Sequence, residues 1–258
     1  MNIAEIVLNK ETIKAQKVAE MKRADGCSFM VSDEHAQSNK AGSISGDKIK
    51  VKAAINTTNI LDSHGDVHIP GLWTKSLKEN KMIMHLQEHK MEFDKIISDG
   101  KDLKATAETM TFKALGYNIE GETQVLLFES TVKRERNLYM FKQYADGNVK
   151  NHSVGMRYVK LFLAVNDDKY PEEKAVWDKY FPIVANGKAA IDAGYFWAVT
   201  EAKVIEGSAV PLGSNQVTPT IEITEAADKS TSTIIEPSDD TQLTSKEFIN
   251  ILKTELWN

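Results

Sequence analysis

Two groups of residues have the types and spacing for hydrolytic chemistry, and a histidine belongs to each. The segment HLQEH, from His85 to His89, matches the H-x-x-E-H pattern of zinc peptidases. On a helix both imidazoles would share one face and bind Zn²⁺, while Glu88 activates a water molecule. The pattern is short and needs a third ligand from elsewhere, and its flanking residues favour a strand. A zinc peptidase is therefore the alternative hypothesis, and the main one assumes no metal and no cofactor.

The second group is dispersed along the chain and consists of His89, Ser153 and Glu206. A serine hydroxyl becomes a nucleophile when a neighbouring base takes its proton and a third group orients that base. Gly155 lies two residues after the serine, where a glycine lets a substrate oxyanion approach the backbone. His152 adjoins Ser153, but neighbouring strand residues point to opposite faces, so we do not expect it to be the base.

Composition limits the class of protein. The chain has 258 residues, of which 41% are hydrophobic, and this suffices for one large domain or two small ones. A single cysteine, Cys27, excludes an intramolecular disulfide framework and a cysteine zinc cage. The net charge of −5 argues against nucleic acid as the main partner. No apolar run approaches the roughly 18 residues of a membrane helix. We expect a soluble, cytosolic-type protein.

Four regions are predicted from changes in composition. Residues 1–48 form a helical and irregular arm, and residues 49–223 form the main domain. Residues 224–243, rich in Ser, Thr and Asp, resemble a flexible linker. Residues 244–258 begin with a capping-box pattern and place apolar residues on one helical face.

The main domain is predicted to be α+β, built on an antiparallel sheet or barrel. Period-two alternation or strand-forming residues favour strands, and apolar residues at helical spacing favour helices. Gly147 supplies a left-handed stop after the first of these helices. The helical insertion at 166–196 has no assigned role. The predicted strands are 49–55, 123–132, 154–165 and 197–210, and the predicted helices are 138–144 and 171–184.

Landmarks in a fixed order resemble those of a known family. An early segment carries an Asp, a Gly-Asp pair and a Pro-Gly before an aromatic residue; a His, a Ser-aliphatic-Gly motif and a closing Glu-x-Ser signature follow. Together they span about residues 52–220 and resemble the tailed-phage, HK97-type prohead serine proteases. The landmarks are Asp62, Gly65, Asp66, Pro70, Gly71, Trp73, His89, Ser153, Val154, Gly155, Glu206, Ser208, Val210, Pro211, Asn215 and Thr218.

The resemblance implies a herpesvirus-protease-like antiparallel β-barrel flanked by helices. It also implies a serine endopeptidase that cleaves scaffold, the major capsid protein and itself, in the host cytoplasm inside the immature prohead. His89 would be the base, with His85 as the alternative, and Ser153 the nucleophile. Glu206 would be the third member, with Asp66 as the second choice. Barrel relatives are often dimers, so a homodimer is expected; neither nucleic acid nor membrane is an expected partner.

A non-enzymatic alternative also follows from the sequence. The main domain would then be a scaffold or assembly factor that binds capsid subunits through the C-terminal helix. The apolar face of that helix consists of Phe248, Leu252 and Leu256.

Overall fold

The computed structural model describes residues 2–21 and 46–226. Cys27, most of the predicted linker and the whole C-terminal helix lie outside the described residues. The last described strand ends at Glu225, so the first residues assigned to the linker belong to a strand. None of the helices in the described part of the chain combines the length and apolar character needed to span a bilayer.

Two sheets dominate residues 46–226, which makes the fold α+β. The first has the strand order β5–β6–β1–β9, with antiparallel neighbours. The second has the order β2–β8–β3–β4, and β7 pairs with β8. The strands are β1 (Lys48–Thr57), β2 (Asp66–His68), β3 (Met84–Gln87), β4 (Ile96–Asp99), β5 (Leu103–Thr111), β6 (Glu122–Lys133), β7 (Asn151–Val165), β8 (Tyr195–Val210) and β9 (Thr220–Glu225).

The predicted antiparallel barrel is corrected in two respects. Residues 46–226 form two sheets and no closed barrel. In addition, β2 and β3 both run parallel to β8. They pair with different stretches of β8, and helix α3 (Thr74–Glu79) lies between them in the chain. Both strands are too short to show the alternation that predicts a strand from sequence.

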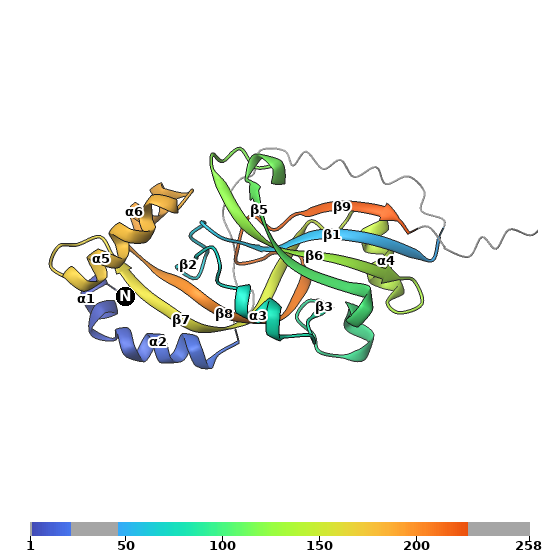
Figure 1. The fold of residues 1–258 in the computed structure, drawn as a ribbon, viewed down its shortest axis with the longest axis horizontal. Coiled ribbons are helices and arrows are strands. Elements are labelled where there is room, and N and C mark those ends of the chain that lie inside the picture. The colour runs from blue at the N-terminus through green and yellow to red at the C-terminus, as the bar shows by residue number, and fades with distance from the viewer. Residues whose placement is uncertain (1, 22–45, 227–258) are drawn as a thin grey trace, which may run out of the picture. The chain divides into compact units, whose positions relative to one another are not determined.

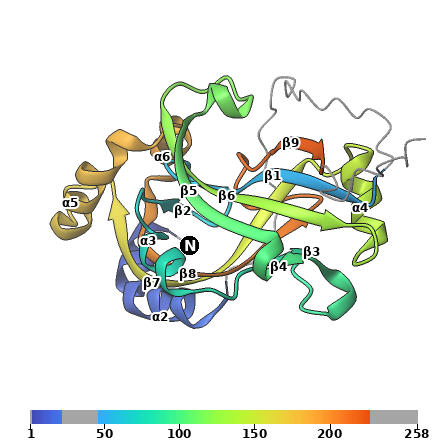
Figure 2. The same cartoon turned by 45° about the vertical axis from the view of Figure 1, so that its right-hand side comes forward.

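The core lies between the two sheets, one above the other in Figure 2. Along β1, Ile49, Val51 and Ile55 are fully buried, whereas the intervening Lys50 is exposed. The alternation holds over the first half of β1, and from Ala53 to Thr57 every residue is buried; the strand predicted at 49–55 is confirmed. The strands predicted at 123–132, 154–165 and 197–210 are found as β6, β7 and β8.

The N-terminal segment packs against the body. Helix α1 (Ile3–Leu8) begins with a capping box between Asn2 and Glu5, and α2 (Lys10–Ala19) follows directly. Ile6 is buried in the main core, and α2 lies along β7 (Figure 1). The first helical turns therefore belong to the same compact unit as the sheets.

The remaining helices cover opposite ends of the long β7–β8 pair (Figure 1). Helix α4 (Leu138–Ala145) buries Phe141 and Tyr144, and Gly147 follows it with φ 69°, as predicted. At the other end are α5 (Pro171–Tyr180) and α6 (Gly187–Ala193). Trp177 of α5 packs on Phe196 at the start of β8, with ring centroids 5.1 Å apart. The insertion at 166–196 thus covers one end of the second sheet with a small apolar core of its own.

Candidate active site

The last residues of β8 separate two polar clusters by strand alternation. Glu206 and Ser208 point to one face of the sheet, which we call the front face. Gly207 and Ala209 point to the back face, towards the first sheet; a Cβ on Gly207 would lie 2.6 Å from the Phe128 ring. Strand β7 runs antiparallel beside this stretch, and β3 runs parallel on its other side.

His89 reaches the front face through an unusual turn. Strand β3 ends at Gln87, and the next two residues, Glu88 and His89, have φ angles of 52° and 58°. Left-handed backbone at residues other than glycine costs about 1–3 kcal/mol each and occurs preferentially at functional sites. The turn lets the His89 backbone N–H donate to Ser208 Oγ at 3.0 Å. The left-handed turn therefore places the His89 ring over the front face of β8.

Glu206 orients the His89 ring. Its Oε1 lies 2.6 Å from His89 Nδ1, and its Oε2 accepts a 2.6 Å hydrogen bond from Ser208 Oγ. The Glu206 side chain is fully buried. With Nδ1–H donating to the carboxylate, the lone pair of the neutral ring is on Nε2. His89 Nε2 is buried and has no hydrogen-bond partner among the described residues. A buried acceptor without a partner is available to accept a proton from a hydroxyl group.

Ser153 is on the same face of the sheet as Glu206 and Ser208, and it does not hydrogen-bond to His89 Nε2 in this structure. It is directly opposite Ser208 in the β7–β8 ladder, and facing residues have Cβ atoms about 4.5–5.5 Å apart on the same face. Ser153 is buried, and within residues 2–21 and 46–226 its hydroxyl makes no hydrogen bond. Ser208 Oγ, in contrast, already donates to Glu206 and accepts from His89. Of the two serines, Ser153 is therefore the one whose hydroxyl is left to react.

Gly155 contributes space. It faces Glu206 across the ladder, and a Cβ at this position would lie 1.8 Å from Glu206 Oε1. Only glycine lets the carboxylate cross β7 at this point. The sequence predicted Gly155 for a different reason, as the backbone donor to an oxyanion, and that role stays a prediction.

Asp66, the second choice for the third member, is wrong on geometry. It pairs with Trp197, nine residues from Glu206 along β8 and about 30 Å away at strand spacing. Its carboxylate accepts from Tyr158 Oη at 2.8 Å and from Lys17 Nζ at 2.6 Å. These contacts give Asp66 a structural role at the other end of the sheet.

The zinc hypothesis and the choice of His85 as base fail together. The residues from Met84 to Gln87 form a strand, so His85 and His89 do not share a helical face. His85 lies opposite Gly207 on the back face, with Nδ1 2.8 Å from Ser130 Oγ and Nε2 3.1 Å from Tyr144 Oη. No group of three potential metal ligands occurs in residues 2–21 and 46–226.

His152, as expected, points away from Ser153. Its ring lies on the back face and contacts Tyr144. Sequence reasoning included Ser208 only as part of a family signature and did not give it a contact. A serine two residues after the candidate acid in a strand shares its face, and this spacing is the signal that could have identified it. The left-handed turn at Glu88 and His89 has no such signal.

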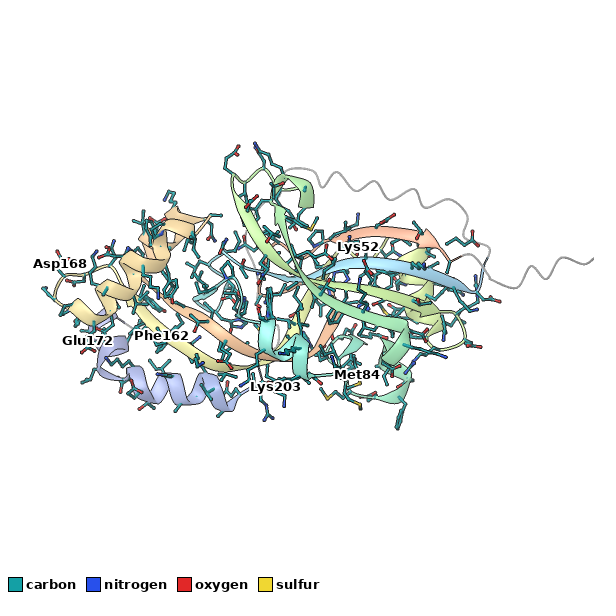
Figure 3. All side chains as sticks on the ribbon, in the orientation of Figure 1. Lys52, Met84, Phe162, Asp168, Glu172 and Lys203 are labelled. Carbon is teal, nitrogen blue, oxygen red and sulfur yellow. The ribbon has the colours of Figure 1, made fainter. Side chains whose placement is uncertain are left out.

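A pocket of about 180 Å³ lies between α4 and the ends of β3 and β8, and His89, Ser153 and Glu206 are not among its lining residues. Residues of α4 line it together with Glu88 and Ala209. Val149 and Pro211 give it apolar walls, and the Glu88 carboxylate is paired with Lys90 at 2.8 Å. In Figure 3, Met84 marks the start of β3, on the half of the described body that carries the site; Phe162 and Glu172 mark the helix-covered end.

Comparison with known proteins adds no assignment. No protein-family model matches the chain, and no match was found among curated proteins or solved structures.

Proposed function

We propose that this protein is a serine endopeptidase with His89 as base, Ser153 as nucleophile and Glu206 as the orienting acid. The observation that carries the proposal is the state of His89. Its Nδ1 is held by a buried carboxylate at 2.6 Å, and its Nε2 is buried without a partner. The Ser153 hydroxyl, also without a partner, lies on the same face of the sheet. This is the division of roles that a serine-histidine-acid triad requires.

The chemical steps follow from these roles. His89 Nε2 takes the proton from Ser153 Oγ while the oxygen attacks the scissile carbonyl carbon. The tetrahedral oxyanion is stabilised by backbone N–H donors, for which the Gly155 segment is the predicted source. When the C–N bond breaks, His89 returns the proton to the leaving amine, and an acyl-enzyme on Ser153 remains. Water, deprotonated by His89, then releases the acid product and restores the serine.

The order of the landmarks supports a more specific proposal. Under it, the enzyme belongs to the prohead proteases and shares the architecture of herpesvirus proteases. Its substrates are then scaffold, the major capsid protein and its own chain, and it acts as a homodimer inside the immature prohead. The motifs at Asp62–Trp73, His89, Ser153–Gly155 and Glu206–Pro211 carry this part of the proposal.

Covalent labelling tests the chemistry. A fluorophosphonate probe should attach to Ser153 in the native chain, as mapped by mass spectrometry of peptides. The Ser153→Ala variant should not be labelled, whereas Ser98→Ala, which removes another buried serine hydroxyl, should be labelled normally. Native protein that stays unlabelled, or is labelled elsewhere, would contradict the nucleophile assignment.

Co-expression tests the biological substrate. With the cognate capsid protein and scaffold, the native chain should process both, and Ser153→Ala should leave both intact. Normal processing by the variant would contradict the peptidase proposal. Absence of processing by either chain, together with stable binding to capsid protein, would favour the assembly-factor alternative.

A further inference from the structure

A second set of titratable side chains lies on the back face, directly behind the candidate triad. His85, Tyr144 and His152 are fully buried and joined by hydrogen bonds. Tyr144 Oη lies 3.1 Å from His85 Nε2 and 3.0 Å from His152 Nε2. The chain continues from His85 Nδ1 to Ser130 Oγ at 2.8 Å and from His152 Nδ1 to the Thr218 carbonyl at 3.1 Å.

The Thr218 carbonyl at one end of this series of hydrogen bonds fixes the direction of all of them. A carbonyl oxygen only accepts, so His152 Nδ1–H donates to Thr218 and His152 Nε2 carries the lone pair. Tyr144 Oη–H therefore donates to His152, and Tyr144 Oη accepts from His85 Nε2–H. His85 Nδ1 then accepts from Ser130 Oγ–H. Both rings are neutral in this arrangement.

Burial favours the same neutral state. It lowers the pKa of His85 well below its ordinary value and lowers the pKa of His152 to about 4. The Tyr144 pKa is raised by burial, so its hydroxyl keeps the proton that it donates. The side chains in contact with the two rings come from β3, β6, α4 and β7, and none carries a carboxylate.

The hydrogen-bonded residues His85, Tyr144 and His152 lie on or between the strands that carry the candidate triad. His85 is on β3 opposite Gly207, and His152 is on β7 opposite Ala209. The small residues of β8 leave room for the two rings to approach to 6.0 Å between centroids across the middle strand. Tyr144 thus links β3 to β7 across β8. These are the strands that lead to His89 and contain Ser153.

We propose, given the serine-peptidase function above, that Tyr144 is a positioning residue for that reaction. Its hydroxyl joins His85 to His152 and so fixes the separation of the strands that carry the base and the nucleophile. Misplacement of reacting groups by about 1 Å costs on the order of a hundredfold in rate. Removal of the hydroxyl should therefore lower kcat and leave KM unchanged, because no substrate contact is lost.

The test compares two tyrosine variants. Tyr144→Phe keeps the ring and removes the bridging hydroxyl. The control is Tyr158→Phe, which removes another buried tyrosine hydroxyl, one that lies 3.1 Å from His68 Nε2 at the far end of the sheet. Both variants should unfold at lower urea concentration than the native chain. Tyr144→Phe alone should lose about tenfold to a hundredfold in kcat on a peptide substrate.

The outcomes separate this inference from the proposed function. Native protein without Ser153-dependent hydrolysis overturns the function, and the positioning role with it. Active native protein with equal kcat in both variants overturns the positioning role alone. If Tyr144→Phe does not fold, Ser130→Ala is assayed instead, since it removes only the terminal donor to His85. A lower kcat for Ser130→Ala supports the role, and an unchanged kcat overturns it.

Discussion

At the C-terminal end of β8, the front and back faces carry similar side chains that differ in their hydrogen bonding. On the back face each polar atom of His85, Tyr144 and His152 takes part in a directed chain of hydrogen bonds. On the front face His89 Nε2 and the Ser153 hydroxyl have no partner among the described residues, and the His89 backbone is left-handed. His89 Nε2 is buried like the back-face rings, so solvent exposure does not explain why it has no partner.

The contrast separates stability from chemistry. A fully satisfied buried network rigidifies the elements that it joins. Buried atoms without partners and strained backbone cost free energy, and they persist where function requires them. Under the proposed function, the back face therefore holds the strands in place and the front face carries out the reaction. Three substitutions on the front face and one pH series on the back face test this contrast.

The largest effect on rate is expected from Glu206→Gln. The amide keeps the shape of the carboxylate but no longer stabilises the imidazolium that forms when His89 takes the serine proton. We expect kcat to fall by about 10³–10⁴-fold, measured on a peptide substrate. The control is Glu173→Gln, which changes another buried carboxylate, paired with Lys10 on the helical side. A Glu206→Gln enzyme within tenfold of native would contradict the role of the acid.

Gly155→Ala should also strongly impair the front face. The new methyl group would lie 1.8 Å from Glu206 Oε1, so the carboxylate must move away from His89. We expect kcat to fall by about a hundredfold or more. Gly187→Ala is the control, since its Cβ would meet only ordinary contacts at 3.5 Å in α6. Activity assays and a crystal structure of the variant would show whether Glu206 has moved.

The back face should make stability depend on pH. The His152 pKa is about 4 in the native chain and about 6.5 when unfolded, so between these values the unfolded chain binds more protons. The free energy of unfolding should therefore fall as pH falls from about 6.5 to about 4. His152 alone contributes about 3 kcal/mol, and His85 acts in the same direction.

Urea unfolding at pH 7, 6, 5 and 4 measures this dependence. Substitution of His152 by Gln should flatten it, while substitution of the partly exposed His64 should leave the steep dependence in place. A native chain whose stability is constant across this range would contradict the neutral, buried state of the two rings.

The smallest effect on rate is expected from Ser208→Ala. This change removes a donor to Glu206 and leaves the His89 backbone N–H without an acceptor, which costs about 1–3 kcal/mol for a buried group. We expect a loss in kcat of about tenfold to a hundredfold. Ser76→Ala is the matched control, because Ser76 Oγ also accepts a backbone N–H, from Val204 of the same strand. Equal kcat in the two variants would contradict a positioning role for Ser208.

Local patterns in the sequence predicted much of the fold. The alternation in β1, the apolar run of β6 and the Gly147 stop after α4 each reflect contacts within one element, so they can be recognised without the rest of the chain. Strands β4, β5 and β9 were not predicted. Strands β2 and β3 were also missed, because three or four residues are too few to show a period. Their parallel pairing with β8 is the reason that the expected antiparallel barrel was wrong.

The candidate site was predicted by residue type and by resemblance. His89, Ser153 and Glu206 were chosen, but the sequence left His85 and Asp66 as alternatives. These were removed by contacts between residues far apart in the chain: His85 with Ser130 and Tyr144, and Asp66 with Tyr158 and Lys17. Contacts of this kind have no local signature.

The sequence alone indicated the longer helices and strands and which side chains share a face within those strands. It separated His152 from Ser153, because adjacent strand residues point in opposite directions. Which of these faces meet depends on the tertiary structure. The register of β7 on β8 places Ser153 opposite Ser208, and the left-handed turn after β3 brings His89 over Glu206. Register and turn depend on the packing of the whole sheet, since a shift of one residue would move each side chain to the other face.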